Sequence, residues 1–161
     1  MPGDLYRDRA LRELVLGIRI DKAGILSADD DLFTVVGQVL IVLIMGQVTV
    51  VMDGGASTVK LNEKTSSIDL CAATTITSDA VGELYFLSGD TGAVVNGADA
   101  PTLKVGQLAG TPHAPIIFGL GNGVLGSLTI ESTETGADTG EIRWSLFYIP
   151  MEDGAYVEAA A

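Results

Sequence analysis

The chain has 161 residues, of which 47% are hydrophobic and 19% charged, and its 9 Lys and Arg against 21 Asp and Glu give a formal net charge of −12. That length predicts a single domain with its own core. The lone Cys71 excludes an intrachain disulfide and any metal site that needs two cysteines. The acidic balance argues against nucleic acid as a partner, because phosphate binding needs clustered cations.

The N-terminal residues mix charged and apolar side chains. Residues 3–13, GDLYRDRALRE, predict either a short helix with Asp4 as its N-cap or an arm that orders only against a neighbour. We therefore assign 1–13 as an N-terminal arm or short helix. Residues 14–20 have the apolar and β-branched content of a strand, and DKAGILSADDD at 21–31 has the composition of a loop.

The most informative segment is Val35–Met52, VVGQVLIVLIMGQVTVVM, which is almost continuously apolar and carries no charge. A strand with one wet face alternates apolar and polar residues, so this segment predicts a strand covered on both faces. Its length also suits a membrane span. Gln38, Gln47, Thr49 and the lack of flanking Lys or Arg favour instead one long strand, or two strands that meet at Gly46.

The low charge of the whole chain and this apolar strip together predict that copies of the chain bury surface against each other. Ordinary globular domains carry about 25% charged residues, more than the 19% found here. We expect an interface between copies that includes Val39, Ile41, Leu43, Met45, Val48 and Val50.

The rest of the chain predicts short strands separated by turns. The clearest is Glu141–Ile149, in which Ile142, Trp144, Leu146 and Tyr148 share one face. Phe147 and Ile149 lie on its otherwise polar face, which suggests that this face is covered at one end. Other strands are predicted at Leu32–Val36, Thr58–Asn62, around Ile68 and Leu70, at Thr74–Thr77, Glu83–Leu87, near Ala93–Val95 and Leu103–Val105, and at Pro115–Gly119 and Val124–Ile130.

Three stretches predict irregular structure. Residues 88–114 are rich in Gly, Ala, Asp and Thr and predict a long loop excursion, a kind of segment that is usually functional or interfacial. Residues 131–140 predict a polar hairpin tip, and 151–161 an exposed C-terminal tail. The sum, with 14–150 as the domain, is an all-β fold: an antiparallel β-sandwich, jelly roll or β-barrel with an N-terminal arm.

Residues that could carry chemistry are few. His113, the only histidine, lies between two prolines in TPHAP, and no GxSxG motif accompanies it. The run Asp29-Asp30-Asp31 lacks the ligand spacing of an EF-hand, so a solvated loop is favoured over a calcium site. Cys71 is most simply a small buried side chain. The strand-alternating positions of the large aromatic residues favour the core over a ligand platform; these are Tyr85, Phe86, Phe118, Trp144, Phe147 and Tyr148. We expect no enzymatic activity, no cofactor and no metal.

Four segments together resemble the small virion proteins of tailed bacteriophages. They are RELVLGIRIDKAG at 12–24, LFTVVGQVLIVLIMGQVTVVM at 32–52, KLNEKTSSIDLCAATTITSDAVGELYFLSGD at 60–90 and TGEIRWSLFYIPMEDGAYVEAA at 139–160. The resemblance lies in the order and the local sequence of these segments, covers most of the chain and includes no active-site residue. It implies a capsid decoration (cement) protein, made in the host cytoplasm and located on the capsid surface of the virion.

The resemblance further implies a homotrimer that clamps neighbouring subunits of the major capsid protein. A protein that binds only the assembled shell stabilises it by mass action. The N-terminal arm, the loop excursion and the tail are the segments expected to reach the shell, through Leu5, Tyr6, Arg9 and Tyr156. Alternative expectations are a carbohydrate-binding module, or a structural module of a fibre or tail. A small barrel enzyme ranks last, because metal-dependent barrels recruit several histidines.

Overall fold

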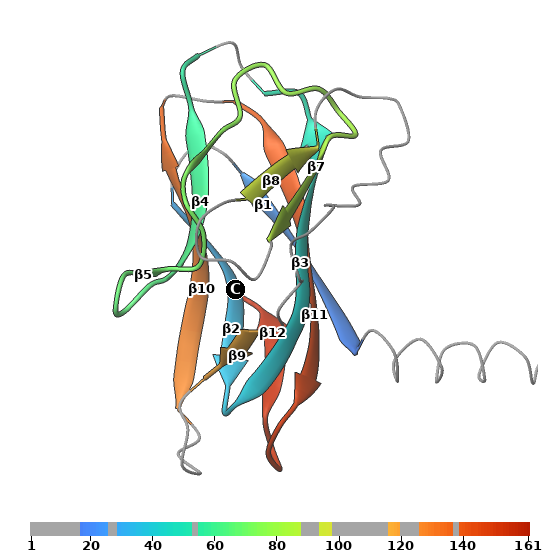
Figure 1. Cartoon of the computed structure of the whole chain (residues 1–161), viewed down its shortest axis with the longest axis vertical. Coiled ribbons are helices and arrows are strands. Elements are labelled where there is room, and N and C mark those ends of the chain that lie inside the picture. The colour runs from blue at the N-terminus through green and yellow to red at the C-terminus, as the bar shows by residue number, and fades with distance from the viewer. Residues whose placement is uncertain are drawn as a thin grey trace, which may run out of the picture.

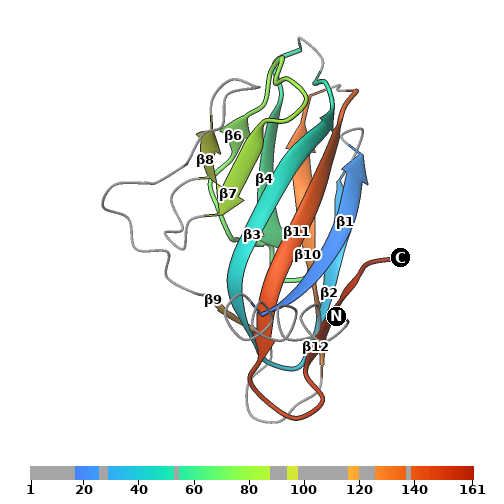
Figure 2. The ribbon, with the colours of Figure 1, turned by 90° about the vertical axis from the view of Figure 1, so that its right-hand side faces the viewer.

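The computed structural model describes residues 17–25, 29–52, 55–87, 94–97, 116–119, 126–136 and 139–161. Within these ranges the chain is all-β, and two six-stranded antiparallel sheets pack against each other as a β-sandwich (Figures 1 and 2). The predicted sandwich is therefore confirmed. The two sheets are not joined into a closed barrel by any strand pairing among the described residues.

The first sheet, sheet A, has the strand order β1-β11-β3-β7-β8, and β9 pairs with β3 beyond the end of β7. Its centre is β3 against β11, the longest ladder in the molecule. The bounds are β1 Ile18–Ile25, β3 Val39–Val50, β7 Leu84–Leu87, β8 Val94–Gly97, β9 Ile116–Phe118 and β11 Glu141–Pro150.

The second sheet, sheet B, has the strand order β12-β2-β10-β4-β5, and β6 pairs with β4. The bounds are β2 Asp30–Val36, β4 Thr58–Glu63, β5 Ile68–Asp69, β6 Thr74–Thr75, β10 Ser127–Thr135 and β12 Tyr156–Ala159. Most connections, such as β2 to β3 and β10 to β11, cross from one sheet to the other. The β2–β3 crossing is tight: Gly37 has φ +70°, and a Cβ there would lie 2.8 Å from Glu152 Oε1.

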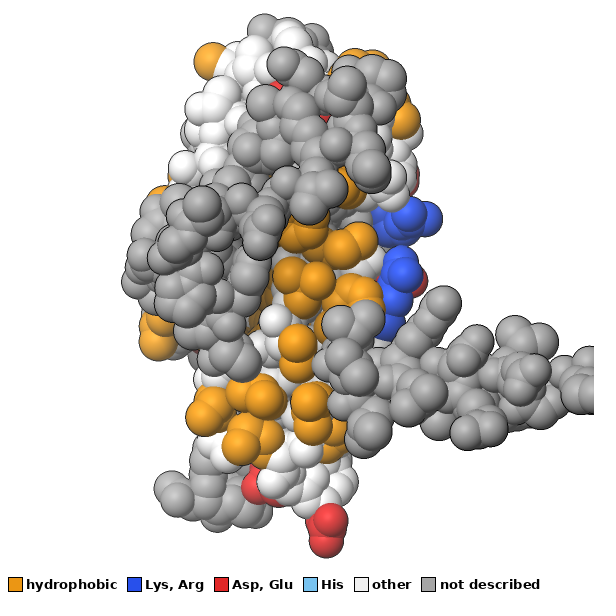
Figure 3. All heavy atoms as spheres, turned by 45° about the vertical axis from the view of Figure 1, so that its right-hand side comes forward, with side chains coloured by type: hydrophobic (Ala, Val, Ile, Leu, Met, Phe, Trp, Pro, Cys, Tyr) orange, Lys and Arg blue, Asp and Glu red, His pale blue; other side chains and the backbone are white. Residues whose placement is uncertain are grey.

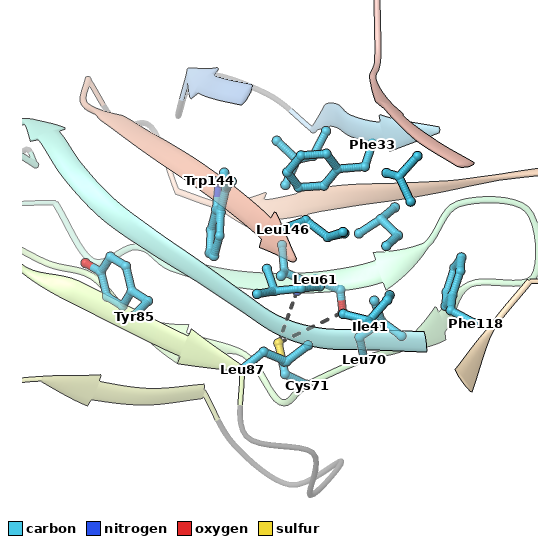
Figure 4. Close-up of a cluster of buried hydrophobic side chains, with 14 of the residues drawn as sticks. Phe33, Ile41, Leu61, Leu70, Cys71, Tyr85, Leu87, Phe118, Trp144 and Leu146 are labelled. Atoms are coloured by element: carbon cyan, nitrogen blue, oxygen red, sulfur yellow. Dashed lines mark hydrogen bonds between the residues drawn. The ribbon is translucent and has the colours of Figure 1, made fainter. Parts of the chain in front are cut away.

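One hydrophobic core fills the space between the sheets (Figure 4). Alternate residues of β11 point into it, as the sequence pattern predicted: Ile142, Trp144, Leu146 and Tyr148 are all buried. The ring centroids of Trp144 and Tyr85 lie 6.4 Å apart. Both rings flank Gly46 of β3, which pairs with each of them across the ladder. A Cβ at Gly46 would lie 2.8 Å from Trp144 Cζ3, so glycine is what lets this ring pack flat on β3.

Three predicted boundaries are wrong. The segment 21–25, predicted as loop, continues β1, because Asp21 hydrogen-bonds to Ser145 and Lys22 Nζ donates to the Ala160 carbonyl at 2.8 Å. The polar stretch after Ile130 continues β10 to Thr135, paired with β4. The apolar strip Val35–Met52, predicted as one long strand or as two strands that meet at Gly46, is instead divided at Gly37. Val35 and Val36 end β2, residues 39–50 form β3, and Gly46 lies within β3.

The predicted exposed tail is also wrong. Residues 156–159 form β12, an edge strand of sheet B paired with β2. Ala155 and Val157 bury their side chains, and the Ala160 N–H donates to the Leu32 carbonyl at 3.0 Å. Alternation in this segment rests on two small apolar residues between acidic and alanine neighbours, which is a weak signal in sequence.

Candidate interaction surface

The outer face of sheet A, which points away from sheet B, carries mainly apolar side chains. They alternate along β3, β7, β9 and β11 with the residues that enter the core. We call this set the apolar face; it consists of Leu40, Leu43, Met45, Leu84, Phe86, Ile117, Phe147 and Ile149.

Strand register places these side chains next to one another. Leu40 pairs with Ile117 on one side and with Ile149 on the other. Leu43 pairs with Phe147, and Met45 pairs with Phe86. Directly paired residues on one face of a sheet have Cβ atoms about 5 Å apart, so their side chains touch. Figure 3 shows the outcome, a band of hydrophobic side chains running along this side of the molecule.

Several members of the apolar face are open to solvent in the single chain. Ile117 is 59% exposed and Ile149 is 39% exposed. The others are half-buried. Contiguous apolar patches larger than a few hundred Å² are uncommon on monomers and mark interaction sites. This face is therefore the candidate functional surface of the described chain.

A polar network borders the apolar face on the β1 side. Arg19 Nε lies 2.8 Å from Asp21 Oδ1, and Arg19 Nη2 donates to Ser145 Oγ at 3.2 Å. The same guanidinium lies 5.7 Å from the centroid of the Phe147 ring, in cation–π range. Basic side chains accordingly line one margin of the hydrophobic band in Figure 3. Arg19 thus joins the charged margin to the apolar face.

The carboxyl group of Asp21 titrates under the control of this network. Partial burial opposes its ionisation, but hydrogen bonds from Ser145 and Arg19 and the positive charges of Arg19 and Arg143 outweigh that effect. The pKa of Asp21 therefore lies below its ordinary value. Asp21 accordingly presents a carboxylate to this margin at neutral pH.

Polar contacts also border the apolar face toward the end of β3. Arg143 Nη2 donates to Gln47 Oε1 at 2.6 Å, and Thr49 Oγ1 donates to Glu141 Oε1 at 2.7 Å. The apolar side chains thus form a defined patch with polar borders, which is the composition of a binding surface with a hydrophobic centre and a polar rim.

The structure distributes the six predicted self-interface residues over three environments. Val39, Ile41 and Val48 are at most 2% exposed and belong to the core between the sheets. The expectation that they contact another copy is corrected: the second sheet of the same chain covers them. Leu43 and Met45 do lie on the apolar face. Val50 is 48% exposed and ends β3.

The sequence pattern could not assign these faces because β3 is apolar on both. A β-bulge adds to the difficulty: Phe147 pairs with Leu43 and Tyr148 with Ile41, so Val42 is an extra residue. The alternation shifts there by one position. The missed members of the apolar face include Leu40, Phe86 and Ile117. The signal that pointed to it correctly was on β11, where Phe147 and Ile149 break a polar face.

Of the predicted shell-contacting residues, Leu5, Tyr6 and Arg9 lie outside the described residues. Tyr156 is 44% exposed on the edge strand β12. It therefore lies on sheet B, away from the apolar face.

Residues singled out for chemistry have structural settings where they are described. Cys71 is fully buried, and its Sγ accepts from the Leu61 N–H at 3.2 Å (Figure 4). Burial raises the pKa of the Cys71 thiol. Asp31, in β2, pairs with Lys64 at 2.8 Å. His113 lies outside the described residues. Trp144, Tyr85, Phe118 and Tyr148 are core residues, as predicted. The same prediction is wrong for Phe86 and Phe147, which are half-buried on the apolar face because they lie on the outer side of sheet A.

Two surveys of the described residues gave no candidates. They contain no cluster of three or more His, Cys, Asp or Glu side chains placed to hold a metal ion. None of their segments forms a helix of the length and apolarity that crossing a membrane requires.

Comparison with known proteins finds no matching family model, no matching curated protein and no matching solved structure. The interpretation of the apolar face therefore depends on its own chemistry.

Proposed function

We propose that this chain is a non-catalytic structural protein of a tailed-phage virion, which associates with copies of itself and decorates the assembled head. The observation that carries the proposal is the apolar face on the outside of a well-packed sandwich. A protein whose role is to bind other proteins needs such a surface and a rigid body behind it.

Two further features support the proposal. The core is continuous and its aromatic residues are buried, so the body is rigid enough to clamp a shell. The sequence segments that resemble phage virion proteins include β3 and β11, the strands that contribute most of the apolar face. Weak contacts repeated over an oligomer and over many shell sites add by avidity.

The test is binding to heads. Purified protein is added to phage heads that lack it and to unassembled major capsid subunits, and bound protein is measured by sedimentation. We expect binding to heads, no binding to free subunits, and a higher temperature of head disruption. Binding to neither, or recovery of the protein only with tails or fibres in purified virions, would contradict head decoration.

A further inference from the structure

The apolar face extends over enough of sheet A to form a complete protein–protein interface. The ten residues of β11 span about 33 Å at 3.3 Å per residue. Across the sheet, β3, β11 and the β7 and β9 strands that share one position beside β3 make three strand positions, and the β1 margin makes a fourth; at about 4.8 Å spacing these give a width of roughly 15–20 Å. That is roughly 500 Å² in projection, and protruding side chains make the accessible area larger. A standard interface buries about 800 Å² on each partner, so this face and its polar margin match one side of such an interface.

The charges around the apolar face suit a second copy of the chain. The net charge of −12 would oppose contact between copies through most surfaces. The charged side chains described on the outside of sheet A are two cations, Arg19 and Arg143, and two anions, Asp21 and Glu141. This face is therefore locally neutral. A strongly basic or acidic partner would find no complementary field here, whereas an identical face would meet no net repulsion.

The margin is also complementary to itself. Arg19 and Asp21 are neighbours there, so each copy offers both a donor guanidinium and an acceptor carboxylate. In a two-fold contact the same patch of both copies is used, so a charged margin must carry both signs to be complementary to itself. We infer that the apolar face of sheet A is buried against a second copy of this chain, with Leu43 and Phe147 at its centre. This concerns only contact between copies, so it can fail independently of head binding.

The test compares two lysine substitutions. Leu43→Lys places a charge in the apolar face, and Thr34→Lys places the same charge on the outside of sheet B. Both reduce the net negative charge by the same amount, so a difference in association between the two variants cannot come from the overall charge. Oligomeric mass is measured by size-exclusion chromatography with light scattering over a hundredfold range of concentration, and Trp144 fluorescence checks that the core is intact.

We expect the unaltered protein and Thr34→Lys to form the same oligomer. Leu43→Lys should raise the dissociation constant at least tenfold and shift the protein toward the 16.7 kDa monomer with unchanged Trp144 emission. An unaltered protein that is monomeric over the whole concentration range would overturn the inference. This holds if the apolar face then binds heads, and it holds equally if the face binds no hydrophobic dye because another segment covers it. An oligomer that survives Leu43→Lys would overturn it too. In either case head binding by the unaltered protein remains a separate measurement.

Discussion

The outer faces of the two sheets differ although they flank the same core. On sheet A, residues that alternate with core positions are Leu40, Leu43, Phe147 and Ile149. On sheet B, most of the equivalent positions are polar, among them Thr34, Thr58, Lys60, Thr129, Thr133 and Glu158. The exceptions are Val36 and Tyr156, which pair with each other at the β2–β12 edge. Both sheets have long central strands, so strand formation does not explain the difference.

The polar face shows what a water-facing sheet of this protein looks like. On sheet B, Thr34 pairs with Thr129, and Thr133 pairs with Lys60. Thr133 Oγ1 donates to Asn62 Oδ1 at 2.6 Å, and Lys60 Nζ lies 2.7 Å from Asp69 Oδ1. Antiparallel sheets with one solvated face show this alternation. Sheet A departs from it, which is why its outer face is assigned to a partner.

The largest effect on folding is expected from a charged substitution on the core side of β3, compared with the same substitution on its outer side. Ile41→Asp puts a carboxylate into the core, where Ile41 is 2% exposed, and should cost about 3–5 kcal/mol. That is much of the stability of an ordinary domain, so we expect little folded protein by circular dichroism. Leu43→Asp, two residues away but on the apolar face, should remain folded. Equal unfolding of both would show that the two sides of β3 are not distinct.

A smaller effect is expected from a change that alters the core and leaves both outer faces intact. At Gly46→Ala the new Cβ would meet Trp144 Cζ3 and Ile142 Cγ2, each at 2.8 Å. Overpacking of this kind costs about 1–3 kcal/mol, measurable by urea denaturation. Gly24→Ala is the matched control, since its nearest contact is 3.2 Å, to the Leu32 side chain. Oligomeric mass should be unchanged in both variants, because the proposed association involves the apolar face and not the core.

On sheet B we expect a pH-dependent effect from Glu63. This buried side chain ends β4 and accepts hydrogen bonds from Ser66 and from the Thr65 N–H. Burial disfavours its charged form, but these bonds outweigh burial, and the pKa of Glu63 is lowered. Its contribution is therefore present above the ordinary glutamate pKa of about 4.3 and is lost as the pH falls through the lower value in the folded protein.

Glu63→Gln should accordingly cost about 1–2 kcal/mol at pH 7, and the difference from the unaltered protein should shrink toward pH 3 in urea titrations. Glu158→Gln, an exposed position on β12, is the control and should change little. A difference that stayed constant with pH would contradict the assigned role of the Glu63 carboxylate.

The smallest effect is expected from making part of the polar face apolar. Thr34→Val with Thr129→Val replaces one cross-strand pair on sheet B and suits the strand preference for β-branched residues. Stability should change by less than about 0.5 kcal/mol, and the oligomeric mass should not change. New association through sheet B would mean that a single apolar pair suffices, and that the size of the patch on sheet A is not what matters.

The sequence predicted some elements well because local periodicity carried the signal. The β11 pattern Ile142, Trp144, Leu146, Tyr148 identified the buried face of that strand, and short apolar runs located β4, β7 and β9. It was less successful at β1 and β12. Their polar residues are held in edge strands by partners distant in the chain, such as Ser145 for Asp21 and Leu32 for Ala160.

The sequence alone therefore determined that the chain is acidic and unusually rich in apolar strand residues, and that the part described by the structure is all-β, because these properties follow from composition and alternation. Only the tertiary structure decided which side of β3 is core and which is surface. Both sides of that strand are apolar, and the bulge at Val42 changes the alternation within it. Ile41 and Leu43 are both large aliphatic residues of one apolar run, so the sequence does not distinguish them. Only the position of sheet B buries Ile41 and leaves Leu43 facing outward.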